Sequence, residues 1–130
     1  MKHIVGTKSV FSFIVTDEMT ATFDGELIHS VLSTFWLSYY FEWYSRKMID
    51  RHFKTHENAC GSELAIKHIS PAFIDEKVTI EVLVFSVDDS KVTCKLEAFV
   101  EKRKIATGQT VQFVSTNQFF KEKFKPKEKP

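Results

Sequence analysis

The pattern of apolar and polar positions divides the chain into short alternating segments and one long segment that is apolar on every side. The long segment covers residues 31–52, lacks proline and glycine, and fits a helix of about six turns at 3.6 residues per turn. Between Glu26 and Arg46 its one charged residue is Glu42, which stands among aromatic residues. Because a helix that is apolar all round is buried all round, we expect the rest of the chain to wrap it.

Five other segments alternate with the period of two that is typical of strands. They cover residues 7–15, 62–70, 77–87, 91–101 and 105–115, and Gly108 in the last one is a candidate bulge. One strand, one long helix and then four strands joined by short turns predict an α+β fold, with a five-stranded antiparallel sheet curved around the helix. One such sheet cannot cover every side of the helix, so the pattern also predicts a second subunit.

Two remaining segments are predicted to lie outside the main helix and strands. Residues 16–30 form an acidic connecting segment with a turn at Asp24-Gly25, and Ser30 or Ser33 is placed to cap the helix. Residues 117–130 contain five lysines, two glutamates and two prolines. We expect a domain over residues 1–116 followed by a mobile basic tail, with a phosphate-contacting arm as the alternative.

Composition narrows the class of protein. The formal net charge of the 130 residues is +1, which argues against a dedicated nucleic-acid binder. No apolar run reaches the roughly 18 residues of a membrane span, and no secretory signal is recognisable at the start. The two cysteines, Cys60 and Cys94, form no framework, so we expect free thiols in a cytoplasmic protein.

Three polar residues occupy positions where the pattern calls for apolar ones. They are Thr34 at the start of the helix, Glu42 eight residues later, and His68 on the inward face of the strand that follows. A hydroxyl, a carboxylate and an imidazole together can perform acyl transfer. Each also has a structural interpretation, since a buried threonine can bond to its own helix and a lone histidine is often a satisfied core residue. His52, His56 and Cys60 are spaced four residues apart, as metal ligands can be, but without a fourth ligand nearby we expect no metal.

The sequence resembles the hotdog-fold thioesterases, and within them the fluoroacetyl-CoA thioesterase-like family. The similarity rests on the Val-x-Ser-Thr start of the helix at residues 31–34, on Glu42 eight residues after Thr34, and on a Gly-Ser step followed by a histidine. It continues through three further motifs, at His68-Ile-Ser-Pro-Ala, Lys104-Ile-Ala-Thr-Gly and Thr110-Val-Gln-Phe-Val.

The resemblance implies an acyl-CoA thioesterase whose catalytic set is Thr34, Glu42 and His68, with Gly61 and Ser62 binding substrate. It implies a homodimer or dimer of dimers with the site at a subunit interface, and no cofactor beyond the coenzyme A of the substrate. The segment before the helix is short and matches no substrate-gating element, so fluoroacetyl selectivity is not implied. The alternative is a non-catalytic hotdog domain that binds an acyl-CoA or a small aromatic ligand.

Overall fold

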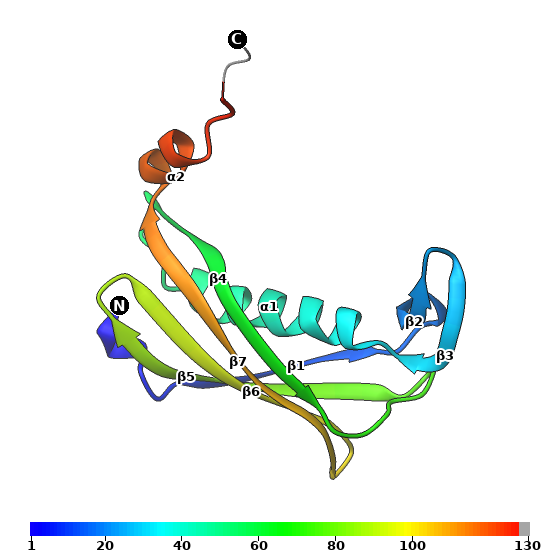
Figure 1. Ribbon diagram of the computed structural model, residues 1–130. Helices are drawn as coiled ribbons and strands as arrows, with labels where there is room; N and C mark the ends of the chain where they lie inside the picture. The colour runs from blue at the N-terminus through cyan, green and yellow to red at the C-terminus, as the bar shows by residue number, and fades with distance from the viewer. Residues whose placement is uncertain (128–130) are drawn as a thin grey trace.

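A five-stranded antiparallel sheet forms the frame of the molecule and curves around helix α1 (Figure 1). The computed structural model describes residues 1–127. The strand order is β1-β5-β6-β7-β4, so β1 and β4 are the two edges of the sheet. This arrangement confirms the predicted α+β fold. The bounds are β1 Lys8–Ile14, α1 Thr34–Asp50, β4 Glu57–His68, β5 Lys77–Asp88, β6 Lys91–Val100 and β7 Arg103–Thr116.

Helix α1 packs one face against the sheet. The Ser33 hydroxyl accepts a hydrogen bond from the Trp36 amide at 3.1 Å, so Ser33 is the predicted cap. The buried face repeats with helical spacing, and its residues are Leu37, Phe41, Tyr44, Ser45, Met48 and Ile49.

Gly108 lets the helix approach the sheet closely. A Cβ atom at this position would lie 2.7 Å from the Phe41 ring and 2.5 Å from the Ala65 carbonyl oxygen. Gly108 pairs in regular register with Leu96 and Ile66. The prediction of a bulge at Gly108 was therefore wrong, because the glycine makes room for Phe41 instead of interrupting the strand.

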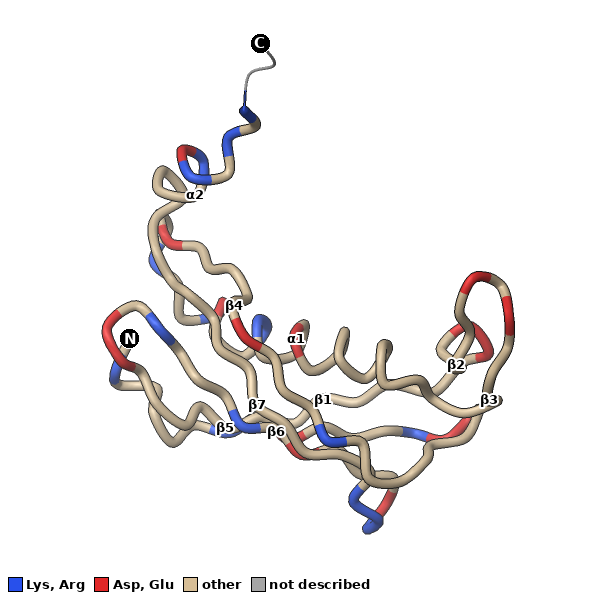
Figure 2. Tube along the Cα trace, viewed as in Figure 1, with Lys and Arg blue, Asp and Glu red and all other residues tan. Residues whose placement is uncertain are grey.

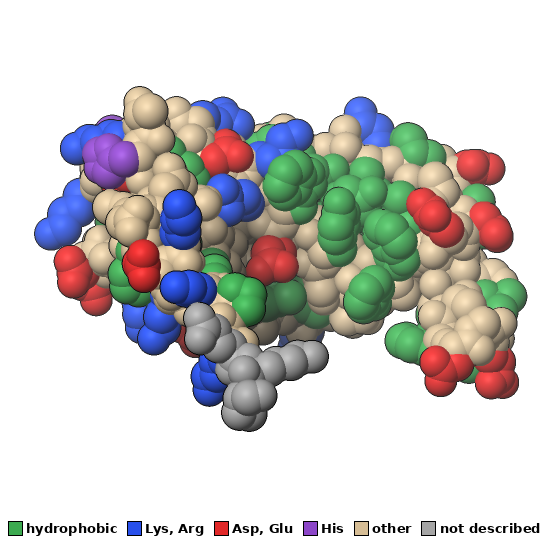
Figure 3. Space-filling model, turned by 90° about the horizontal axis from the view of Figure 1, so that it is seen from above, with side chains coloured by type: hydrophobic (Ala, Val, Ile, Leu, Met, Phe, Trp, Pro, Cys, Tyr) green, Lys and Arg blue, Asp and Glu red, His purple; other side chains and the backbone are tan. Residues whose placement is uncertain are grey.

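The opposite face of α1 is exposed in the single chain. Phe35, Tyr39 and Trp43, spaced four residues apart, retain exposed fractions of 67%, 50% and 45%. Seen from above, apolar side chains gather in a patch over this side of the molecule (Figure 3). The prediction that the helix is buried all round was wrong for one chain, because the sheet covers only one side of it. We call Phe35, Tyr39 and Trp43 the aromatic stripe.

A small hairpin occupies the segment that was predicted only as a connection. Helix η2 (Asp17–Met19) leads into β2 (Thr20–Phe23), which pairs with β3 (Glu26–Leu32) in a separate two-stranded sheet. The predicted turn is confirmed, since Asp24 and Gly25 at its tip have φ values of 50° and 76°. The hairpin projects beyond the N-terminal end of α1 and is rich in acidic residues (Figures 1 and 2).

The chain ends of the described part carry two short helices, η1 (Lys2–Ile4) and α2 (Asn117–Lys123). α2 begins the segment predicted as a tail. Phe120 on α2 is 7% exposed and meets the Phe113 ring of β7 edge-on at 6.2 Å between centroids. The boundary at residue 116 and the mobility beyond it stay predictions, and the end of the tail, residues 128–130, lies outside the described residues.

Both cysteines are free thiols, as predicted. Cys94 is fully buried, and burial raises its pKa to about 11. Within residues 1–127 we find no helix long and apolar enough to span a membrane.

Candidate active site

Thr34 and His68 come together where α1 begins and β4 ends. The Thr34 Oγ1 atom lies 2.9 Å from His68 Nδ1. Burial lowers the pKa of His68, and a backbone interaction with Ser70 offsets part of the effect. The imidazole is therefore neutral at pH 7. Its Nε2 atom is buried and has no hydrogen-bond partner among residues 1–127, an uncommon feature that marks the ring as a functional candidate.

Glu42 and Gly61 form a second pair, two helical turns further along α1. The Glu42 Oε1 atom lies so close to Gly61 that a Cβ atom on Gly61 would overlap it. Because glycine has no side chain, the Glu42 carboxylate can lie directly against the β4 backbone at this position. Unlike the buried carboxylate that the sequence predicted, Glu42 is exposed in the single chain because it lies on the uncovered side of α1.

A cavity of about 230 Å³ adjoins this second pair, and sequence analysis missed two of its residues. Gln112 of β7 lies opposite Gly61 in the sheet and is 2% exposed. Arg46 donates to the Ala59 carbonyl at 2.8 Å and to Asn58 Oδ1 at 2.7 Å, which ties α1 to the start of β4. The sequence holds a signal for each of these two residues. Gln112 is polar at an inward strand position, and Arg46 is a cation four residues after Glu42 on the same helix.

The two pairs lie apart within one chain. Eight residues along a helix correspond to an axial distance of about 12 Å between Thr34 and Glu42. One thioester carbonyl cannot contact groups separated by that distance. A single chain therefore assembles Thr34 with His68 and Glu42 with Gly61, but it does not bring all four residues together.

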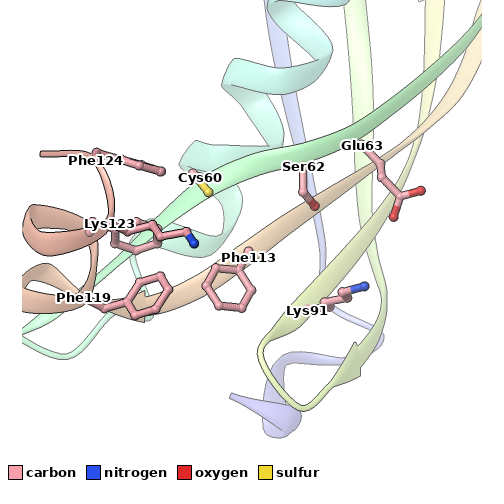
Figure 4. A pocket seen from close by; sticks show the side chains of 9 residues that line it. Cys60, Ser62, Glu63, Lys91, Phe113, Phe119, Lys123 and Phe124 are labelled. Atoms are coloured by element: carbon pink, nitrogen blue, oxygen red, sulfur yellow. The ribbon is translucent and has the colours of Figure 1, made fainter. Parts of the chain in front are cut away.

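The side chain of Ser62 does not join either pair. Its hydroxyl donates to the Val111 carbonyl oxygen at 3.2 Å, across a register shift between Gly61 and Glu63. Ser62 and Cys60 line a different cavity, on the sheet face opposite α1 (Figure 4). Any contact of Ser62 with substrate near Gly61 would have to come from its backbone.

Comparison with known proteins assigns the chain to a family. Residues 15–118 match the family model described as fluoroacetyl-CoA-specific thioesterase. No curated protein sequence gives a significant match.

Solved structures show the same fold. A hypothetical protein from Thermus thermophilus, described as a thioesterase superfamily member, has a TM-score of 0.91 and 26% identity, with 95% of this chain and 93% of that chain covered. The fluoroacetyl-CoA thioesterase FlK follows with a TM-score of 0.86 and 18% identity, covering 96% and 97%. A hot-dog-like protein from Thermanaerovibrio acidaminovorans has a TM-score of 0.84 and 19% identity, covering 92% and 89%.

The match to the family model covers more than half of the chain and includes α1 and strands β2 to β7. The chain belongs to the fluoroacetyl-CoA-specific thioesterase family and is a thioester hydrolase of hotdog fold.

Proposed function

We propose that the protein hydrolyses an acyl-CoA to the free acid and coenzyme A at a site shared by two subunits. In this proposal one subunit supplies Thr34 and His68, and the partner subunit supplies its Glu42 and Gly61. The observation that carries it is the separation of the two pairs within one chain, whose axial component is about 12 Å.

The edge strand β4 supports this arrangement. It pairs with β7 on one side only, and residues 61–65 are exposed. Gly61 and His68 lie on either side of a midpoint near Leu64 and Ala65. A two-fold axis there would pair β4 antiparallel with its copy and set His68 of one chain opposite Gly61 of the other, since an isologous interface places each residue of a contact on both subunits. The Thr34–His68 pair would then face the partner subunit's Glu42.

The aromatic stripe supports the same assembly. Phe35, Tyr39 and Trp43 lie on the uncovered side of α1, and large exposed apolar patches on a soluble protein mark interaction sites. The stripe runs beside Glu42, so a partner that covered it would also enclose the carboxylate. Enclosure removes water from the reacting groups and strengthens their electrostatic interactions.

The proposed chemistry uses each group once. The Glu42 carboxylate either takes a proton from the attacking water or attacks the carbonyl carbon itself, and the C–S bond then breaks. The Thr34–His68 pair holds the thioester. The proton released by water, during its attack in the first route or during hydrolysis of the Glu42 anhydride in the second, passes through His68 to the thiolate of coenzyme A. The first backbone N–H groups of α1 receive the negative charge that develops on the carbonyl oxygen. Hydrolysis in ¹⁸O-labelled water during a single turnover separates the two routes, because only a Glu42 anhydride places label in the enzyme.

The substrate class follows from the family and the cavity. Solved structures of two variants of the fluoroacetyl-CoA thioesterase FlK hold, in one, fluoroacetate and coenzyme A and, in the other, acetyl-CoA. The cavity beside Glu42 is smaller than the roughly 300–1,000 Å³ of pockets for drug-sized ligands, which favours a short acyl group. A panel of acyl-CoA thioesters of increasing length, followed by free-thiol detection, tests this directly.

Complementation between two inactive variants tests the shared site. Glu42→Gln and His68→Ala chains are unfolded and refolded together, so that mixed dimers form. A mixed dimer has one intact site if the residues come from two chains, and none if they come from one. Random mixing then predicts about a quarter of the wild-type activity, because half of the dimers are mixed and each carries one working site of two. Activity no higher than that of either variant alone would contradict the shared site.

A further inference from the structure

A second cavity lies on the sheet face opposite α1 and is not part of the proposed reaction site (Figure 4). Its volume is about 510 Å³. Cys60 of β4 and Lys91 of β6 both pair with Phe113 of β7, and residues paired across an antiparallel sheet project on the same face. Gln112, the neighbour of Phe113, projects on the other face toward Glu42. We call this space the outer cavity.

The body of the outer cavity is aromatic. Phe113 forms its floor on the sheet. Phe119 and Phe120 of α2 lie over it, together with Phe124 directly after the helix. The rings form a contiguous cluster, with centroids 5.6 Å apart for Phe113 and Phe119 and 5.4 Å apart for Phe120 and Phe124. Phe119 and Phe124 remain 40% and 61% exposed, so this apolar surface is accessible. A volume of this size with an apolar lining is typical of sites for small organic ligands.

Two lysines form the polar rim of the cavity and lie on either side of Phe113 (Figure 4). Lys91 and Lys123 line the cavity from β6 and from α2, and within residues 1–127 neither forms a salt bridge. Among the described residues of the lining, Glu63 is the one that is acidic. The segment 117–127 carries four lysines against one glutamate, and its basic residues follow α2 in Figure 2. The rim therefore attracts an anion, while the floor favours hydrocarbon.

We propose that the outer cavity binds an amphiphilic carboxylate, meaning a hydrocarbon chain or ring that ends in one anionic group. The apolar part lies on Phe113 and on the phenylalanines of and next to α2. The carboxylate is attracted by Lys123 beside those rings and by Lys91 across Phe113. A nucleotide fits less well, because the Ser62 hydroxyl is bonded to the Val111 carbonyl and the phenylalanines offer no polar atom for a base edge. The site is separate from the one that the proposed reaction uses.

Protection of Cys60 measures occupancy of this cavity. Cys60 lines the outer cavity and is partly exposed, whereas Cys94 is fully buried and burial raises its pKa to about 11. A neutral disulfide reagent, 4,4′-dithiodipyridine, should therefore modify Cys60 selectively in the folded full-length chain. We expect saturating dodecanoate to slow this modification at least about tenfold, because the chain covers the thiol. A Cys60→Ser variant verifies which thiol is read.

Charge variants test the rim. Lys91→Gln combined with Lys123→Gln should weaken dodecanoate protection about tenfold, which corresponds to the loss of roughly 1.4 kcal/mol of charge-assisted binding. Lys121→Gln is the matched control: it removes one lysine from the same helix outside the cavity and should leave protection unchanged. Dodecanol, which has the same chain without the charge, should protect more weakly than dodecanoate.

Four results would overturn the proposal. They are no protection by dodecanoate, equal protection by dodecanol, protection by adenosine 3′,5′-bisphosphate in place of dodecanoate, and a Cys60 already unreactive in the ligand-free protein because another copy of the chain covers it. Acyl-CoA turnover of the charge variants is measured alongside. Normal turnover with lost protection supports a separate site, so the outcome does not depend on the proposed reaction.

Discussion

Glu42 is the residue on which the proposed chemistry depends most directly. Glu42→Gln keeps the shape and most of the hydrogen bonding of the side chain but removes the negative charge. We expect kcat for acyl-CoA hydrolysis to fall by at least about 10²-fold, the low end of the contribution of a positioned acid or base. The fold should survive because Glu42 is exposed in the single chain. Thermal melting and thioester hydrolysis on one preparation separate the two effects, and a folded variant with normal kcat would exclude Glu42 from the reaction.

Gly61 tests the position of that carboxylate. In Gly61→Ala the new methyl group overlaps Glu42 Oε1 and displaces it from the β4 backbone. A displacement of about 1 Å in a catalytic group can cost about 10²-fold in rate, so kcat should fall by that order while the melting temperature changes little. In a Glu42→Gln background the second substitution should cost much less. Fully additive losses in kcat would show that Gly61 acts independently of Glu42.

Because the pKa of His68 is lowered in the folded chain, we expect stability to depend on pH. Burial holds the pKa of His68 below its ordinary value of 6.5, so the unfolded chain binds this proton more tightly than the folded chain does. The free energy of unfolding should therefore decrease as pH falls below about 6.5, and this contribution should level off once pH is below the lowered pKa. Urea titrations of wild type and His68→Asn across this range measure it. A wild-type curve parallel to that of His68→Asn would contradict it.

At the scale of elements, the main strands were predicted from periodicity and the long helix from an apolar segment without proline or glycine, whereas the short elements were not predicted. The predicted strand at 77–87 and the observed β5 nearly coincide because Val78, Ile80 and Val82 alternate strictly with polar residues. β4 begins five residues earlier than predicted, since residues 57–61 lack apolar alternation. The β2–β3 hairpin and α2 were missed because acidic and lysine-rich composition reads as loop when only side-chain polarity is considered.

The candidate site, too, was predicted only in part from the sequence. Thr34, Glu42 and His68 were found because polar residues interrupt apolar positions, and that signal is local. The eight-residue spacing already separates Thr34 from Glu42 along the helix. That Thr34 meets His68 and Glu42 meets Gly61 depends on how α1 crosses the sheet, which the linear spacing does not encode. Gln112 was missed although it is a polar residue at an inward strand position, because its place opposite Gly61 becomes evident only when β7 is in register with β4.

Helix α2 is held to the sheet mainly by Phe120. Because this ring is 7% exposed and meets Phe113, Phe120→Ala should lower the free energy of unfolding by about 3 kcal/mol, the low end for truncating a buried phenylalanine. Phe124→Ala is the control, since that ring is 61% exposed and should cost much less. Chemical denaturation of both variants gives the comparison. Equal costs would mean that α2 is not docked as described.

At the scale of the whole molecule, activity and assembly should be lost together. Tyr39→Lys places a charge in the aromatic stripe beside Glu42, and burying that charge in an interface is costly. We expect the proposed dimer to dissociate and turnover to fall with it, as followed by light scattering and thioester hydrolysis over a range of protein concentration.

Val10→Lys serves as the control for this change. Val10 on β1 is 60% exposed but lies at the other edge of the sheet, so the variant should keep both assembly and activity. A wild-type chain that is monomeric and fully active at micromolar concentration would contradict the shared site.

The open edge of β4 also has a consequence for the newly made chain. Until its N–H and C=O groups on the free side are paired, β4 is a template onto which any other extended chain can add, and uncovered edges of this kind promote aggregation. Dilution during refolding, or a substitution that blocks association, would keep the chains apart. Such chains would therefore accumulate in an aggregation-prone state with β4 unpaired. Yield on refolding should pass through a maximum with protein concentration, since too little protein delays pairing of the edges and too much favours disordered growth.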